Sequence, residues 1–261
     1  MTATAPHTHD QAQRRPLATL VRPSLPAPVF RGRIGSSAAR GFYPAPHRYE
    51  VYLRGHCPDA LRVFVTLGLL GLREEVPVTV LGTPGVAPAA EAGLRHAYEA
   101  ARHRYEGPLS VPALCDRWSG RVVSNHAPDI LRDLTDRFPS PACGDGTCGS
   151  GLRPACRTAD IDRLESLLHP LPEESGHACF RAALDELDRR LADSPYVWGE
   201  APTASDVDAW AALLWPAAGY GSELRATLEE HPGRRRLLSY VERLSSRPEF
   251  RAALEAGLGP R

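Results

Sequence analysis

The chain has 261 residues, 43% of them hydrophobic, which is enough for one large domain or two smaller ones with an ordinary buried core. Its 31 basic residues are all arginine and are balanced by 31 acidic residues. The net charge therefore gives no sign of a basic surface for nucleic acid or an anionic membrane. We therefore expect neither nucleic acid nor a membrane as a partner.

The predicted compartment is the cytoplasm. No apolar run reaches the length of a membrane span, and the N-terminus lacks the charged-then-apolar pattern of a secretory signal. The six cysteines do not have the spacing of a secreted disulfide framework, so a reducing compartment keeps them as thiols. The absence of lysine indicates a GC-rich coding sequence, which favours a bacterial source.

The first half of the chain alternates strand and helix patterns. Residues 1–28, rich in Pro, Ala, Thr and Arg, predict a disordered N-terminal extension. The patterns that follow are strand 49–54, helix 58–72, strand 76–81, a Pro/Gly-rich connection 82–88, helix 91–105, strand 110–115, a turn at 116–120, strand 121–123 and helix 127–138. The order βαβ then ββα, with an antiparallel hairpin, predicts an α/β thioredoxin-like domain over residues 29–138.

The second half reads as helical. Residues 139–157, rich in Gly and Pro, predict a loop or linker, and residues 158–261 predict an all-helical domain. Its helices are expected at 159–168, 173–192, 204–218, 223–230 and 234–245. Thr203 and Asp206 form a capping box at the start of the third of these helices, where we expect a structural role worth about 1 kcal/mol.

Cys57 is the main candidate for chemistry, because it stands where the first strand runs into the first helix. Pro58 suits the first helical turn, and the helix beyond it brings backbone N–H groups and a partial positive charge to the sulfur. Such a position favours the thiolate and predicts a lowered pKa. The alternative is a small buried apolar residue without chemistry.

Val111 and Pro112 open the third strand and strengthen the thioredoxin assignment. In that fold the bond before this proline is typically cis, which places the preceding backbone against the active-site sulfur. The alternative is a plain edge-strand proline.

Several segments resemble one family, the xi-class glutathione S-transferases or glutathionyl-hydroquinone reductases. The likeness covers roughly residues 30–138 and, more loosely, 159–225. The segments are Phe30-Arg31, Arg48–Pro58, Leu94–Tyr98, Val111–Asn125 and Asp129-Ile130, of which Val111–Asn125 is the most specific. The resemblance implies a glutathione S-transferase fold, a thioredoxin-like domain followed by an all-α domain, with Cys57 as the catalytic thiol and Val111, Pro112, Asn125, His126 and Asp59 around the bound thiol.

The chain departs from the family at three positions of the expected thiol site and in residues 139–180, which are compressed and lack the family's Gly-Val-Tyr-rich segment. The family motif is Cys-Pro-Trp-Ala, and this chain has Asp59 where the motif has tryptophan. In the family a Glu-Ser pair holds the γ-glutamyl end of glutathione, and this chain has His126-Ala127 at those positions. The substrate side retains Tyr220 as a match for a family pocket tyrosine, and His56 is a further candidate substrate-binding residue. The cosubstrate is therefore expected to be a low-molecular-weight thiol, either glutathione or another such as mycothiol or ergothioneine.

By resemblance, the expected activity is thiol transfer or reductive dethiolation of an S-conjugated hydroquinone-like or other electrophilic small molecule. Ala60 stands where a resolving cysteine would be, so an external thiol has to complete the cycle. Two other functions stay open, a transferase specialised for one electrophile and a non-catalytic binding protein with a transferase fold. The resemblance also leaves a homodimer open.

A metal site is not expected. Cys143, Cys148 and Cys156, with His169, His177 and Cys179 nearby, lack the close Cys-x2-Cys pairs of common zinc sites. Arg62, on the first helix, is expected to form a structural ion pair.

Overall fold

The computed structural model describes residues 29–35, 41–82, 87–138, 151–169, 173–217 and 222–260. The predicted extension 1–28, the larger part of the predicted linker with Cys143 and Cys148, and Tyr220 lie outside these residues.

A four-stranded mixed sheet forms the first half. Its strands are β1 (Tyr49–Arg54), β2 (Val78–Leu81), β3 (Ala113–Asp116) and β4 (Arg121–Ser124), in the order β2-β1-β3-β4. β1 and β2 are parallel, while β3 is antiparallel to β1 and to β4. The predicted hairpin and thioredoxin-like topology are therefore confirmed.

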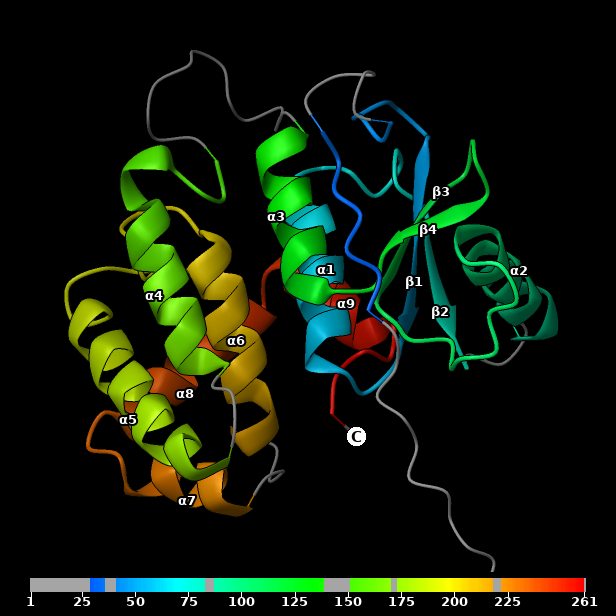
Figure 1. Ribbon diagram of the computed structural model, residues 1–261. Coiled ribbons are helices and arrows are strands. Elements are labelled where there is room, and N and C mark those ends of the chain that lie inside the picture. Colours follow the sequence, from blue (N-terminus) through cyan, green and yellow to red (C-terminus); the bar gives the residue numbers. More distant parts are fainter. Residues whose placement is uncertain are drawn as a thin grey trace, which may run out of the picture.

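Helices cover both faces of this sheet. The three helices of this half are α1 (Pro58–Leu69), α2 (Ala87–Ala101) and α3 (Ala127–Arg137). Figure 1 shows α2 on one face of the sheet, and α1 and α3 on the other, between the sheet and most of the helices of the second half. A separate small apolar cluster, including Leu94 and Tyr98, packs between α2 and the face of the sheet that it covers.

Two helix boundaries differ from the prediction for local reasons. α1 ends at Leu69 rather than at residue 72, because Gly71 adopts a left-handed conformation with φ of 71°. α2 lies about four residues earlier than expected. Arg104 has φ of 54°, and the ring of Tyr105 turns back to stack on Tyr98 at a centroid distance of 4.8 Å.

The second half is a helical bundle, as predicted. Its helices are α4 (Thr158–Leu168), α5 (Glu173–Arg190), α6 (Ala204–Ala217), α7 (Ser222–Glu230), α8 (Arg234–Ser245) and α9 (Pro248–Glu255), after a short 3-10 turn at Ala155–Arg157. α9 was not expected from the pattern. Pro248 begins it in the position that suits proline. No helix in the described part of the chain has both the length and the apolar character to cross a membrane.

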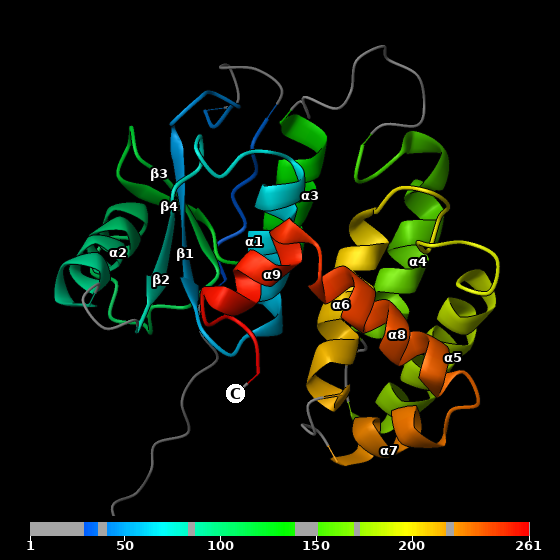
Figure 2. The same cartoon turned by 180° about the vertical axis from the view of Figure 1, so that it is seen from behind.

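One apolar core joins the two halves. α1 packs against α3, α6 and α9, and Figure 2 shows α9 beside α1 on the side away from α3. The fully buried Trp210 of α6 meets Phe250 of α9 edge to face, with ring centroids 5.0 Å apart. Because α1 is held from both halves, the position of its first residue is set by the whole molecule.

Asp206, the acidic residue of the capping box, does more than cap α6. The buried carboxylate of Asp206 accepts hydrogen bonds from the backbone N–H and hydroxyl of Thr203, from the backbone N–H of Val197 and from the hydroxyl of Tyr240. These bonds join the 197–203 turn, α6 and α8. The predicted structural role of Asp206 is thus present, within a larger network than a capping box alone.

Candidate active site at the start of α1

Cys57 lies at the junction that the sequence indicates. β1 ends at Arg54, the chain turns at Gly55 and His56, and Cys57 is the extended N-cap residue of α1, with Pro58 in its first turn. His56 has φ of 56°, in the left-handed region that is uncommon for a residue with a side chain. This turn leaves Cys57 partly buried against the apolar core.

The strand register places the other predicted thiol-binding residues at the same end of the sheet. Ala113 of β3 pairs with Tyr52 near the end of β1, so Val111 and Pro112 lie beside the last residues of β1. Their peptide bond is cis, as predicted. Ser124, the last residue of β4, pairs with Leu114, so the β4–α3 junction also falls at this end.

The predicted lowering of the Cys57 pKa is wrong. Burial raises the pKa of the Cys57 thiol, and the nearby Asp59 carboxylate adds to the rise. The backbone N–H groups of Ala60 and Asp59 favour the thiolate, but the side chain forms no capping hydrogen bond and burial outweighs their effect. The sequence pattern shows the helix start next to the sulfur, but it does not show how much of the sulfur the fold withdraws from water.

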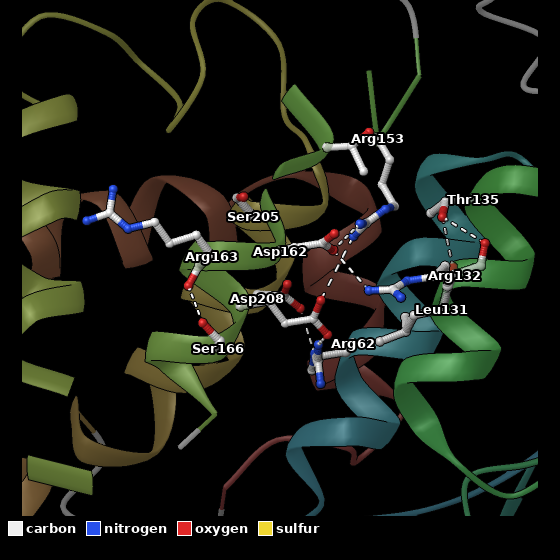
Figure 3. Close-up of polar contacts among 12 residues, drawn as sticks. Arg62, Leu131, Arg132, Thr135, Arg153, Asp162, Arg163, Ser166, Ser205 and Asp208 are labelled. Atoms are coloured by element: carbon white, nitrogen blue, oxygen red, sulfur yellow. Dashed lines mark hydrogen bonds and ion pairs between the residues drawn. The ribbon is translucent and has the colours of Figure 1, made fainter. Parts of the chain in front are cut away.

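Asp59 connects the first turn of α1 to a charged cluster between the two halves. Its carboxylate lies 3.1 Å from Nη1 of Arg62, whose guanidinium is buried and also contacts Glu165 of α4 at 3.0 Å and Asp208 of α6 at 2.7 Å. The structural ion pair expected for Arg62 is confirmed. Figure 3 shows Arg62 and Asp208 meeting between the helices, with Arg153 nearby.

The cavity beside this cluster is too small for an aromatic substrate. It lies among α1, α3, α4 and α6, is lined by Arg62, Arg153 and Asp208 among others, and measures about 20 Å³. That volume holds about one water molecule. The cluster joins the two halves.

Asn125 and His126 both contact neighbouring protein groups. The Asn125 side-chain oxygen accepts from the Phe30 backbone N–H at 2.6 Å, and its amide nitrogen donates to the Tyr98 hydroxyl at 3.1 Å. His126 is the N-cap residue of α3, and its Nδ1 lies 3.1 Å from a carboxylate oxygen of Asp129 without hydrogen-bond geometry. The thiol-binding roles of Asn125 and His126 stay predictions.

Asp129 is itself held by arginine. Arg31 donates two hydrogen bonds to its carboxylate, at 2.6 and 2.9 Å. This pairing lowers the pKa of Asp129, despite the opposing effect of burial. Asp129 is thus already paired, and it does not offer a free carboxylate in place of the glutamate missing from the Glu-Ser pair.

The His56 side chain contacts the segment that follows α9. Its Nδ1 lies 2.7 Å from the carbonyl oxygen of Gly259, and because a carbonyl only accepts, the ring donates from Nδ1. The substrate-binding role predicted for His56 stays a prediction, and this contact gives the side chain a structural partner.

His169 is a further residue of interest, which the sequence drew attention to only as part of a metal cluster. It follows α4, and its backbone N–H donates to the carbonyl oxygen of Glu165, the residue whose side chain contacts Arg62. Its Nε2 is buried without a hydrogen-bond partner among the described residues. Burial, reinforced by the charge of Arg62, lowers the pKa of His169 to about 4.

The cysteines in the described part of the chain gather no metal site. Cys115 is buried in β3, Cys156 is exposed, and Cys179 is half-buried in α5. Within the described ranges no group of three or more His, Cys, Asp or Glu side chains could hold a metal ion.

Comparisons with known proteins agree with this architecture. Residues 158–243 match the family model of the glutathione S-transferase C-terminal domain. The glutathionyl-hydroquinone reductase PcpF of Sphingobium chlorophenolicum is 26% identical over 231 residues, which cover 76% of this chain and 72% of that protein.

Two solved structures show the same fold. The xi-class glutathione S-transferase of Natrialba magadii aligns with a TM-score of 0.69 at 22% identity, covering 88% of this chain and 79% of that one. The glutathione-bound structure of YqjG from Escherichia coli K-12 aligns with a TM-score of 0.66 at 22% identity, covering 85% and 83%. This chain therefore contains a region that matches the glutathione S-transferase C-terminal domain, and as a whole it is similar in sequence to a glutathionyl-hydroquinone reductase and in fold to xi-class glutathione S-transferases.

Proposed function

We propose that the protein is a cysteine-dependent thiol transferase or reductase that removes a thiol from an S-conjugated, hydroquinone-like electrophile. The observation that carries the proposal is the position of Cys57. It caps α1 at the end of the sheet where the cis Val111-Pro112 bond and the start of α3 also lie. The name of the relative PcpF, a glutathionyl-hydroquinone reductase, supports the substrate class.

In the first step the Cys57 thiolate attacks the sulfur of the aryl thioether. A sulfur–sulfur bond forms, the carbon–sulfur bond breaks, and its electron pair leaves with the ring carbon, which takes up a proton. The aromatic product is reduced by two electrons, and the two sulfurs are oxidised to a mixed disulfide on Cys57. A second small thiol then attacks this disulfide and releases Cys57 as a thiolate.

The structure favours an external thiol for this second step. Ala60 stands three residues after Cys57, where a resolving cysteine would lie. Cys115, in the neighbouring β3, is buried, and burial raises its pKa well above the ordinary thiol range. Neither position offers an internal thiolate for resolution.

We further propose that the cosubstrate is a low-molecular-weight thiol other than glutathione, such as mycothiol or ergothioneine. The γ-glutamyl ammonium of glutathione favours a carboxylate partner. At the start of α3 this chain has His126 and Ala127, and the nearby Asp129 is paired with Arg31. Asp59, at the position of the family's tryptophan, adds negative charge near the Cys57 thiol.

The test is intact-mass analysis of the full chain after exposure to the disulfides of glutathione, mycothiol and ergothioneine. The expected result is one adduct per chain, formed best with a non-glutathione thiol and absent from Cys57→Ser. Cys156→Ser is the matched control, because Cys156 is exposed and lies in the 3-10 turn before α4. Efficient adduct formation with glutathione alone would overturn the cosubstrate assignment, and no adduct at Cys57 would overturn the thiol-transfer function.

A further inference from the structure

The segment Ala256–Pro260, here called the closing segment, follows α9 and reaches the turn that carries Cys57. Gly257 ends the helix with φ of 73°, its N–H donates to Leu254, and the N–H of Leu258 donates to Ala253. This pair of bonds is a Schellman motif, which terminates a helix and redirects the chain. Here the redirected chain runs toward Gly55 and His56.

One side-chain hydrogen bond and one close backbone approach hold the closing segment against that turn. His56 donates from Nδ1 to the carbonyl oxygen of Gly259 at 2.7 Å. Gly55 approaches so closely that a Cβ atom built on it would lie 2.7 Å from the carbonyl oxygen of Gly257. Between these two contacts Leu258 is fully buried in the main apolar core.

We propose that the closing segment is a positioning element of the active site, which holds the Gly55–His56 turn and thereby sets how deeply the Cys57 sulfur is buried. His56 is a positioning residue in this account. Its left-handed conformation is uncommon for a residue with a side chain, and the bond to Gly259 stabilises it. The proposal deepens the proposed function, because it concerns the reactivity of the same thiol.

The expected consequence follows from the reason for the raised Cys57 pKa. Burial is its main cause, so a turn released from the closing segment exposes the sulfur and makes the thiolate easier to form. Nonspecific alkylation of Cys57 should then become faster, while exchange with a bound substrate becomes slower, because the sulfur is no longer held in place.

The test compares Gly257→Ala with Gly120→Ala in the full chain. Both glycines have positive φ, 73° and 65°, and an added Cβ would meet nothing within 4 Å at either. Gly120 lies in the β3–β4 turn. The two variants therefore carry the same backbone strain, and only Gly257→Ala disturbs the closing segment. His56→Gly is a second variant, which removes the bond to Gly259 while its backbone still accepts the left-handed conformation.

The measurement is the pH profile of iodoacetamide alkylation, resolved by peptide mass spectrometry. We expect alkylation of Cys57 near neutral pH to rise roughly threefold or more in Gly257→Ala and in His56→Gly, with Cys156 unchanged as the internal reference. The alkylation profile of Cys57 in Gly120→Ala should match that of the parent protein. A Cys57 profile that is unchanged in both test variants, or that changes equally at Cys156, overturns the proposal.

This test is independent of the proposed function. Alkylation needs no cosubstrate, so a protein that forms no mixed disulfide can still show the expected profiles. Conversely, unchanged profiles together with a Cys57 adduct would leave thiol transfer standing and remove the closing segment from the site.

Discussion

At the scale of the residue, Cys57 illustrates two opposing effects on one thiol. The start of α1 stabilises the thiolate through its backbone N–H groups, whereas burial and the charge of Asp59 stabilise the thiol. Burial wins, so the resting side chain is mostly protonated at neutral pH. The rate of thiol exchange should therefore keep rising with pH through the ordinary thiol range.

The contribution of Asp59 can be measured directly. Asp59→Asn removes a negative charge beside Cys57, while Arg62 keeps Glu165 and Asp208 as partners. The pKa of Cys57 should fall, and alkylation of Cys57 near neutral pH should become faster. Asp160→Asn is the matched control, because the side chains of Asp59 and Asp160 are each 44% exposed and each pairs with an arginine three residues away. Equal alkylation profiles in the parent and Asp59→Asn would contradict this account.

His169 should make stability depend on pH. Its pKa is about 4 in the folded protein against an ordinary value of 6.5, so between these values the unfolded chain binds a proton that the folded protein does not. The contribution of neutral His169 to the free energy of unfolding is complete above pH 6.5 and is lost as the pH falls toward 4. Between pH 7.5 and pH 5 the loss should be about 1–2 kcal/mol.

Urea unfolding of the parent and of His169→Gln at both pH values tests this directly. The variant should lose less stability on acidification by that amount. An equal loss of unfolding free energy in both proteins on acidification would show that His169 does not cause the pH dependence.

At the scale of the element, Asp206 connects α6 to its surroundings. Because its buried carboxylate accepts four hydrogen bonds, Asp206→Ala leaves several buried donors unsatisfied. The free energy of unfolding should fall by about 3 kcal/mol or more, well beyond the cost of a lost cap alone. Tyr240→Phe, which removes one donor, should cost about 1 kcal/mol. Denaturant unfolding compares the two, and equal costs would mean that the network contributes little beyond that one bond.

Much of the fold follows from the sequence because its elements are marked locally. β1 is an uninterrupted strand that ends at a Gly-His-Cys-Pro turn, and Pro58 and Pro128 mark helix starts. α9 was missed because its eight residues give too short a period to stand out from α8. The early end of α2 accompanies stacking between Tyr98 and Tyr105, a contact that was not visible in the local pattern.

The site was predictable in part for the same reason. Cys57 and the cis Val111-Pro112 bond are visible as local motifs, and strand order then brings them together. The contact of His56 with Gly259 joins residues about 200 positions apart, so no local motif could predict it. The burial of the Cys57 sulfur is likewise a property of the folded chain, which is why the predicted lowering of its pKa was wrong.

At the scale of the whole molecule, Arg62 holds the two halves together. Arg62→Met leaves the nearly buried Asp208 without its cation, and the free energy of unfolding should fall by roughly 3–5 kcal/mol. Arg62→Met combined with Asp208→Leu should recover part of this loss, because it removes the unpaired charge. Arg225→Met, in an exposed pair with Glu229, should change stability by only about 0.5 kcal/mol. A loss no larger than that of Arg225→Met would contradict the role given to Arg62.

The central claim is that Cys57 removes the thiol from an aryl thioether and retains it as a mixed disulfide. A single-turnover reaction, with enzyme in excess over a thiol-substituted hydroquinone and no free thiol present, tests it most directly. We predict that one equivalent of reduced aromatic appears together with one equivalent of Cys57 mixed disulfide, and that Cys57→Ser yields neither. Release of the reduced aromatic by Cys57→Ser at the parent rate would contradict the account.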